Sequence, residues 1–383
     1  MGAWFSSCCD YEGDPKGKDI IQQLEGRNVS GQELVSLRKL VVKILTKHLT
    51  EKAGDLYPRT QEKEAMAKAL VTEFPCFKDR TPGCKGYELF FSEGEGFIEW
   101  RLKTMRQSAK RAGGPSNTSQ LKKKTKNDTD DNETEQCSAE VLEQMEWLKY
   151  HPPTRENSSQ IKANLKATFF YRRSKLVKEA PSITNQLAEM PRFRDSPDLI
   201  NFEFDMLNPG CGSKMLVKWN PYFRPKLTQL SEEAARFNDL DVFKFLLKKL
   251  PTVTAKGFKS KGYDVFSFIM QRRQTGTDVE AFAKTKDVIY AQPFILALGD
   301  ENGNPTEYFI IVDNTSIPGG TNAVEAFDRL YKVHYVFNVH FAKPVLTFFN
   351  FFDGLVYGVS KNIRPTVREL YSQMMQEPQQ KEA

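Results

Sequence analysis

The sequence predicts a mostly helical protein with a small β element, and three observations lead to that class. Apolar residues recur at steps of three and four over most of the chain, which is typical of amphipathic helices. Near residue 300 the pattern changes to two apolar, β-branched runs separated by a dense turn signal. Hydrophobic residues make up 39% of the 383 residues and aromatic residues 12%, which is enough to build cores. We therefore expect an α+β fold.

Composition divides the chain into five segments. They are an irregular N-terminal segment (1–29), a small three-helix domain with a basic third helix (30–112), a disordered charged linker (113–137), a larger helical domain containing a buried β-hairpin (138–375) and a disordered tail (376–383). The linker begins with Gly113, Gly114 and Pro115 and carries almost no large apolar side chains. Such a segment buries too little surface to offset its ordering entropy.

Three helices are expected in the first domain. Ser30 and Glu33 have the spacing of a capping box, and an apolar face follows them. A second helix is predicted over 62–74, where Pro75 ends it. A third covers 98–112, with apolar residues on one face and basic residues on another.

The second domain is predicted to be helical on both sides of a hairpin. The expected helices cover 141–148, 161–177, 200–207, 237–250, 323–331 and 348–356. The expected strands cover 293–298 and 308–312. Both strands are apolar on both faces, which favours a hairpin buried on both faces.

Positive charge is concentrated on the third helix and the linker. Residues 98–126 contain nine lysines and arginines and one glutamate, so this window has a charge of +8. The net charge of the whole chain is +6, so the remaining residues are slightly negative. Such a patch indicates a polyanionic partner or a receptor-read address, and a linker kept soluble by its charge is the alternative. The residues expected to neutralise nucleic-acid phosphates are Arg101, Lys103, Arg106, Lys110 and Arg111.

Two addressing patterns compete. Two basic residues, a ten-residue spacer and a basic cluster form a bipartite nuclear-import pattern, which predicts a nuclear protein and an import receptor as a partner. Its residues are Lys110, Arg111, Lys122, Lys123, Lys124 and Lys126. The start of the chain instead fits an N-myristoylation pattern at Gly2, followed by Cys8 and Cys9 as palmitate acceptors. That alternative predicts an adaptor at the cytoplasmic face of a membrane, and no stretch is apolar enough for a transmembrane segment.

Signatures of catalysis are absent from the sequence. There is no Gly-rich phosphate loop and no C-x-x-C pair, so we expect no enzyme activity, no cofactor and no metal site. Asp313 at a strand end leaves Mg²⁺-dependent phosphoryl transfer as a minor alternative to a turn role. His334 and His340 lie among aromatic residues and are expected to pack and bond locally. The six cysteines, without a secretory signal, indicate free thiols.

Several stretches resemble the family of sterile alpha motif domain-containing protein 3 and its fish relatives. They are Phe74-Pro75-Cys76-Phe77, Trp147-Leu148 with Pro152-Pro153, Phe170-Tyr171-Arg172-Arg173, and Phe327-Asp328 with His334-Tyr335-Val336-Phe337. The resemblance covers about residues 30–375 in order, but no sterile alpha motif domain is visible. It implies no catalytic residue. Together these patterns predict a non-enzymatic interaction protein that binds nucleic acid, with an unknown protein partner.

Overall fold

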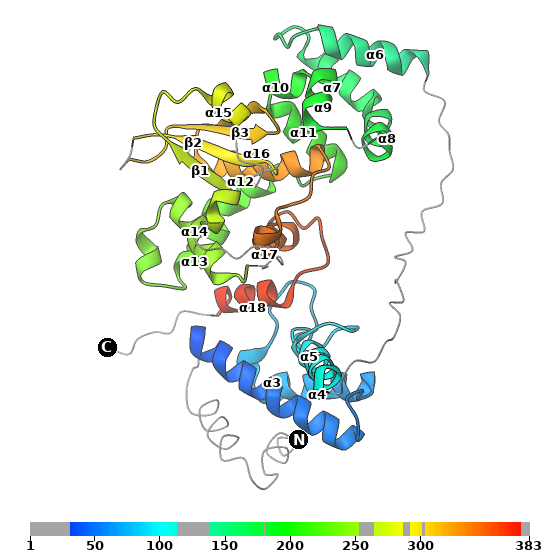
Figure 1. The fold of residues 1–383 in the computed structure, drawn as a ribbon, viewed down its shortest axis with the longest axis vertical. Helices are drawn as coiled ribbons and strands as arrows, with labels where there is room; N and C mark the ends of the chain where they lie inside the picture. The colour runs from blue at the N-terminus through cyan, green and yellow to red at the C-terminus, as the bar shows by residue number, and fades with distance from the viewer. Residues whose placement is uncertain are drawn as a thin grey trace. The chain divides into compact units, whose positions relative to one another are not determined.

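The computed structural model describes residues 31–112, 138–179, 181–252, 264–285, 292–300 and 303–376 (Figure 1). These residues are mostly helical and contain one four-stranded sheet, which confirms the predicted mostly α fold with a small β element. The chain forms two compact units. Unit 1 comprises Met1–Asp131 and Arg364–Ala383, and unit 2 comprises Asn132–Ile363. The predicted linker 113–137 and the start 1–29 lie outside the described residues.

Unit 1 contains the three helices expected from the sequence. They are α3 (Gly31–Ala53), α4 (Thr60–Glu73) and α5 (Phe97–Ala112), with the short helix η1 (Pro75–Phe77) after α4. Val41, Leu70 and Leu102, one from each long helix, are at most 1% exposed in a shared core. Gly96 sets the start of α5, because a Cβ there would lie 2.5 Å from the carbonyl oxygen of Phe90.

The C-terminal helix α18 (Pro365–Met374) belongs to unit 1. The Nε atom of Arg38 in α3 lies 2.8 Å from the Glu369 carboxylate, and the backbone N–H of Arg80 donates to the Ser372 hydroxyl. We expected residues up to 375 in the second domain, so the structure differs from that boundary. Contacts between residues 292 and 331 positions apart leave no local pattern in the sequence.

Unit 2 is built from short helices around the sheet. Its α-helices are α6 (Ala139–Tyr150), α7 (Ser158–Ala167), α8 (Phe169–Glu179), α9 (Ile183–Glu189), α10 (Arg192–Asp195), α11 (Asp198–Leu207), α12 (Lys214–Lys218), α13 (Arg224–Thr228), α14 (Asp239–Lys249), α15 (Val279–Thr285), α16 (Ala323–Val336) and α17 (Leu346–Phe351). Its 3₁₀ helices are η3 (Glu233–Arg236), η4 (Val265–Phe268) and η6 (Lys343–Val345), and its π helices are η2 (Trp219–Phe223) and η7 (Phe352–Val356). The single helix expected over 161–177 is two helices, α7 and α8, separated at the buried Thr168.

The sheet has the strand order β1-β2-β3-β4. Its strands are β1 (Met270–Arg273), β2 (Phe294–Leu298), β3 (Glu307–Val312) and β4 (Thr315–Gly320), and only the β1–β2 pair is parallel. The predicted hairpin is the antiparallel pair β2–β3, with Leu296 opposite Phe309. Every side chain of β2 is buried, as expected, whereas Phe309 is half-buried.

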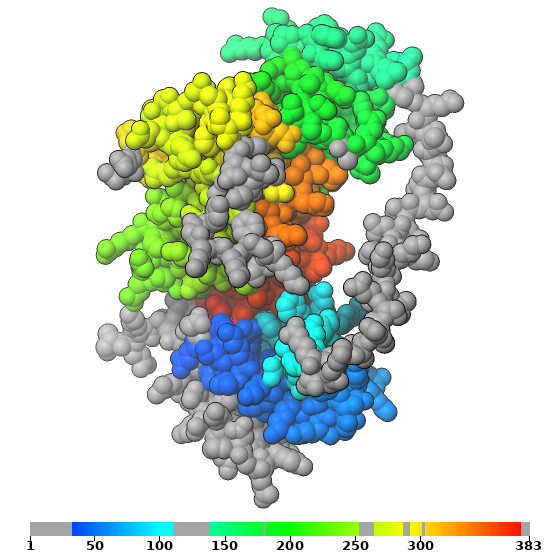
Figure 2. All heavy atoms as spheres, in the orientation of Figure 1, coloured from blue at the N-terminus to red at the C-terminus, as the bar shows by residue number. Residues whose placement is uncertain are grey.

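Helices cover the strands of the sheet. Ala283 of α15 packs with Phe294 and Leu296 of β2, and α16 also contacts β2, β3 and β4. In Figure 2 the yellow atoms, from the part of the chain that contains β1, α15 and β2, lie directly against atoms coloured green. Beyond the sheet, α16 forms an aromatic core, where the rings of Tyr331 and Tyr357 stack 3.9 Å apart. Among the described residues, no helix is both long and apolar enough to cross a bilayer.

Candidate nucleic-acid interface

Helix α5 is anchored in unit 1 by Glu99. Its carboxylate lies 2.9 Å from Lys63 Nζ of α4 and 2.9 Å from Arg106 Nη1, and the Glu99 side chain is only 8% exposed. Arg106 also donates through Nε to the carbonyl oxygen of Leu56 and lies over the ring of Tyr57. The sequence placed Arg106 in the phosphate-binding set. The structure corrects this, because two of its donors are engaged inside the unit.

The Glu99 carboxylate stays ionised in this environment. Burial alone would raise the pKa of Glu99, but hydrogen bonds from Lys63 and Arg106 outweigh burial and hold the pKa below its usual range. The three side chains therefore form a charged anchor. They position α5 rather than face a ligand.

The other predicted residues of α5 divide into two groups. Lys103 is exposed and donates to the carbonyl oxygen of Gly94 at 2.9 Å, and Arg101 is half-buried. Trp100, one turn before Lys103, is 60% exposed, which is unusual for tryptophan. The backbone of Lys110 and Arg111 belongs to α5, but the structure does not describe their side chains. Outside them altogether are Lys122, Lys123, Lys124, Lys126, Gly2, Cys8 and Cys9.

Helix α3 carries a basic surface that the sequence analysis missed. Lys39, Lys43 and Lys47 are exposed at steps of four, so they lie on one face, opposite the buried Leu37 and Val41. We call these three residues the lysine row. The four-residue spacing of these lysines is visible in the sequence. They were missed because they are spread over nine positions, whereas the lysines of the linker are closer together. Only Lys47 of the row has an ion pair among the described residues, to Glu51 at 3.8 Å on the surface.

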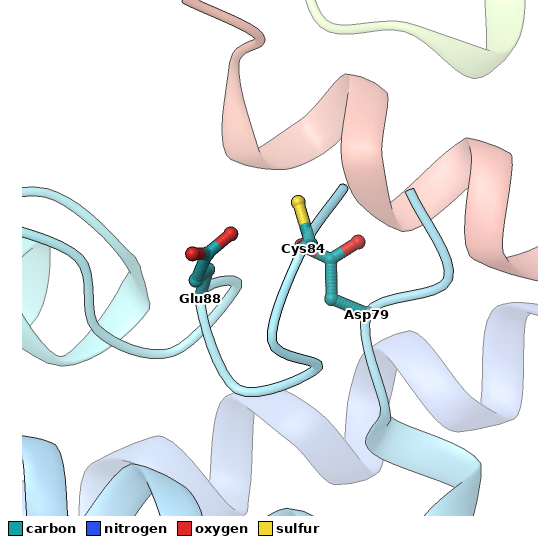
Figure 3. Close-up of side chains that lie close together, drawn as sticks. All are labelled: Asp79, Cys84 and Glu88. Carbon is teal, nitrogen blue, oxygen red and sulfur yellow. The ribbon is translucent and has the colours of Figure 1, made fainter. Parts of the chain in front are cut away.

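One cluster in unit 1 has metal-ligand residue types. Asp79, Cys84 and Glu88 follow η1, and their ligand atoms all lie within 4.8 Å of one another. Figure 3 shows the three side chains on the loop, below the helix α18. From that helix, Arg368 Nη1 lies 3.2 Å from the Asp79 carboxylate and 3.1 Å from the Glu88 carboxylate. A cation is therefore already supplied by the chain.

The thiol in this cluster is protonated at neutral pH in the metal-free protein. Burial, a hydrogen bond with Glu88 and the charge of Asp79 raise the pKa of Cys84 to about 12. Metal ligation by cysteine requires the thiolate. The cluster is better described as an ion-pair network that holds α18. Cys76, Cys84 and Cys211 are free thiols, as expected for those described.

Asp313, His334 and His340, which the sequence analysis also considered, lie in unit 2. Asp313 lies in the turn between β3 and β4 with a φ of 44°, and its carboxylate accepts from the backbone N–H and hydroxyl of Thr184. Asp313 is not part of the metal-ligand cluster found among the described residues. His334 is buried against aromatic rings as expected, whereas His340 is exposed because it lies beyond the end of α16.

Comparisons of the chain with family models, with curated proteins and with solved structures found no match. The resemblance to the family of sterile alpha motif domain-containing protein 3 therefore stays a prediction.

Proposed function

We propose that the protein is a non-enzymatic protein that binds nucleic acid through the lysine row, Lys39, Lys43 and Lys47. The observation that carries the proposal is the exposure of three lysines on one face of a helix whose opposite face is buried. Lys103 and the exposed Trp100 of α5 are offered as additional contacts.

The chemistry of these residues suits a phosphate backbone. Each lysine that neutralises a phosphate releases a condensed counterion, so binding weakens steeply as salt rises. An exposed tryptophan provides a surface on which an unpaired base stacks without regard to sequence. The proposal therefore includes single-stranded as well as duplex nucleic acid, without sequence preference.

A charge-reversal experiment tests the lysine row. The full chain is titrated into a labelled duplex and a labelled single strand of about 20 nucleotides, over a range of salt concentrations, with fluorescence anisotropy as the readout. The triple variant Lys39→Glu, Lys43→Glu, Lys47→Glu should lower the salt slope on duplex by about 3, since each lost phosphate contact removes about 0.9.

The matched control is Lys162→Glu, Lys166→Glu, Lys178→Glu, which reverses three exposed lysines of unit 2 and changes the net charge equally. This control should bind nearly as wild type. Equal losses in both triple variants would refute a specific surface. Binding to anionic vesicles but not to either oligonucleotide would assign the row to membranes instead.

The proposed site of action is the nucleus, on the basis of the bipartite pattern from Lys110 to Lys126 in the sequence. A C-terminally tagged full chain and its Gly2→Ala variant should both accumulate in the nucleus. Membrane staining that disappears in Gly2→Ala would instead support the acylated adaptor.

A further inference from the structure

Unit 2 contains a pocket with an apolar floor. It lies between α6, α8, α9, α10 and the C-terminal end of α16, and it encloses about 500 Å³ when the solvent at its mouth is included. The apolar lining consists of Met145, Leu176, Met190, Phe193, Val336 and Phe337. The rings of Phe193 and Phe337 meet edge to face, 5.9 Å apart. Because part of that volume is open solvent, the hollow suits an inserted side chain better than a large cofactor.

Most charges around this pocket are already paired. Arg172 and Glu203 form an ion pair in the wall, with side chains 7% and 3% exposed. Lys175 and Glu189 form a second pair at 2.8 Å. Arg173 is the remaining charged residue of the lining, so the lining carries one positive charge in excess.

Arg173 is held in a fixed position by the end of α16. Its Nη1 donates to the carbonyl oxygen of Val336 at 2.8 Å and to that of Tyr335 at 3.3 Å. Carbonyl groups in the last turn of a helix lack partners within the helix, so this contact is favourable. The Nε and Nη2 of Arg173 have no hydrogen-bond partner among the described residues. A guanidinium held in this way offers its remaining donors to a carboxylate.

Two large apolar side chains are exposed on the same side of α8 as Arg173. Phe170 is 73% exposed and Val177 is 66% exposed, and they lie three positions before and four after Arg173. Residues at these spacings share a helix face. Arg173 thus lines the pocket and shares a face of α8 with two exposed apolar groups that lie outside the lining. Apolar surface of this kind, beside a polar rim, is typical of protein interaction sites.

We propose that this pocket and the exposed face of α8 are a docking site for an acidic peptide segment of a partner protein. An apolar side chain of the segment enters the pocket, and an adjacent aspartate or glutamate carboxylate binds Arg173. Phe170 and Val177 cover the neighbouring part of the segment. The surroundings do not suit nucleic acid, because a phosphate backbone needs several cations in excess and the lining of this pocket has an excess of one positive charge. The site lies in unit 2 and does not involve the lysine row.

The test uses the full chain and labelled synthetic peptides. Each peptide carries one leucine, phenylalanine or tryptophan and one glutamate at a varied distance from it, and each has a partner in which glutamine replaces the glutamate. Fluorescence anisotropy should show about tenfold tighter binding for the best glutamate peptide than for its glutamine partner. The variant Arg173→Gln should remove this preference.

A second pair of variants keeps the test independent of folding. Phe170→Ser and Val177→Ser change exposed side chains, so they should weaken peptide binding several-fold without changing the thermal midpoint. The matched control Leu216→Ser alters an exposed apolar residue of α12 and should bind as wild type. Equal binding of glutamate and glutamine peptides, or wild-type binding by Phe170→Ser, would overturn the proposal. Saturable binding of phenylpropionate without binding of any peptide would also overturn it, in favour of a small-molecule site.

Discussion

At the scale of single residues, His334 shows how burial changes the titration of one side chain. It is 3% exposed and packs on the ring of Phe341, 4.6 Å between centroids. Its Nδ1 lies 3.1 Å from the carbonyl oxygen of Val339. Burial lowers the pKa of His334 from the ordinary 6.5 to about 4, although its backbone hydrogen bonds act in the opposite direction. The imidazole is therefore neutral in the folded protein at neutral pH.

This burial makes stability depend on pH. Between about pH 4 and pH 6.5 the unfolded chain binds a proton on this histidine that the folded chain does not. Above pH 6.5 this histidine does not lower the free energy of unfolding. As the pH falls toward 4 the free energy of unfolding decreases, and the decrease is about 2 kcal/mol at pH 5. His334→Gln remains neutral, so urea unfolding of this variant should lack that decline. The free-energy difference between wild type and variant should change by about 2 kcal/mol between pH 7.5 and pH 5. Parallel pH profiles would contradict the assignment.

At the scale of elements, the hairpin β2–β3 shows how burial differs within one pair of strands. Phe294 of β2 is 1% exposed and packs with α15, whereas Phe309 of β3 is only partly buried. The two residues therefore form a matched pair in which the same truncation removes different contacts.

Phe294→Ala should lower the free energy of unfolding by about 3–5 kcal/mol, the usual range for a buried phenylalanine. Phe309→Ala should cost clearly less, because a half-exposed ring loses less burial and leaves less of a cavity. Denaturant unfolding of both variants is the measurement. Equal costs would show that the two rings are equally packed in solution.

The elements that could be predicted from the sequence are those specified by local periodicity. Helix α5 has its apolar stripe at steps of four and three, and β2 is apolar throughout, so both were found. Strand β4 was missed because Pro318 and Gly319 are poor strand residues, and a sheet edge tolerates them. The role of Arg106 could not be predicted from spacing. Its partner Glu99 is on the same helix, but its hydrogen bond to the carbonyl oxygen of Leu56 depends on tertiary packing.

At the scale of the whole molecule, unit 1 is assembled from two distant parts of the chain. Its helices α3 to α5 come before unit 2, and α18 comes after it. The ion pair between Asp79 and Arg368 joins residues 289 positions apart. The Asp79 side chain is fully buried, and that of Arg368 is 16% exposed. A charge buried to this degree is costly unless its partner is present.

The ion pairs of Arg368 close unit 1 between its two parts. Arg368→Gln removes the cation that Asp79 and Glu88 share, so it leaves a buried carboxylate without its ion pair. We expect faster hydrogen exchange over residues 79–91, and a double-mutant cycle with Asp79→Asn should give a coupling energy of about 1–3 kcal/mol. Lys85→Gln, an exposed residue of the same loop, changes the net charge equally and should leave exchange unaltered. If Arg368→Gln and Lys85→Gln behave alike and the cycle gives no coupling, the two parts of unit 1 are not held together by this ion pair. A positive coupling would mean that the structure of unit 1, and with it the presentation of the lysine row on α3, depends on residues that follow unit 2 in the chain.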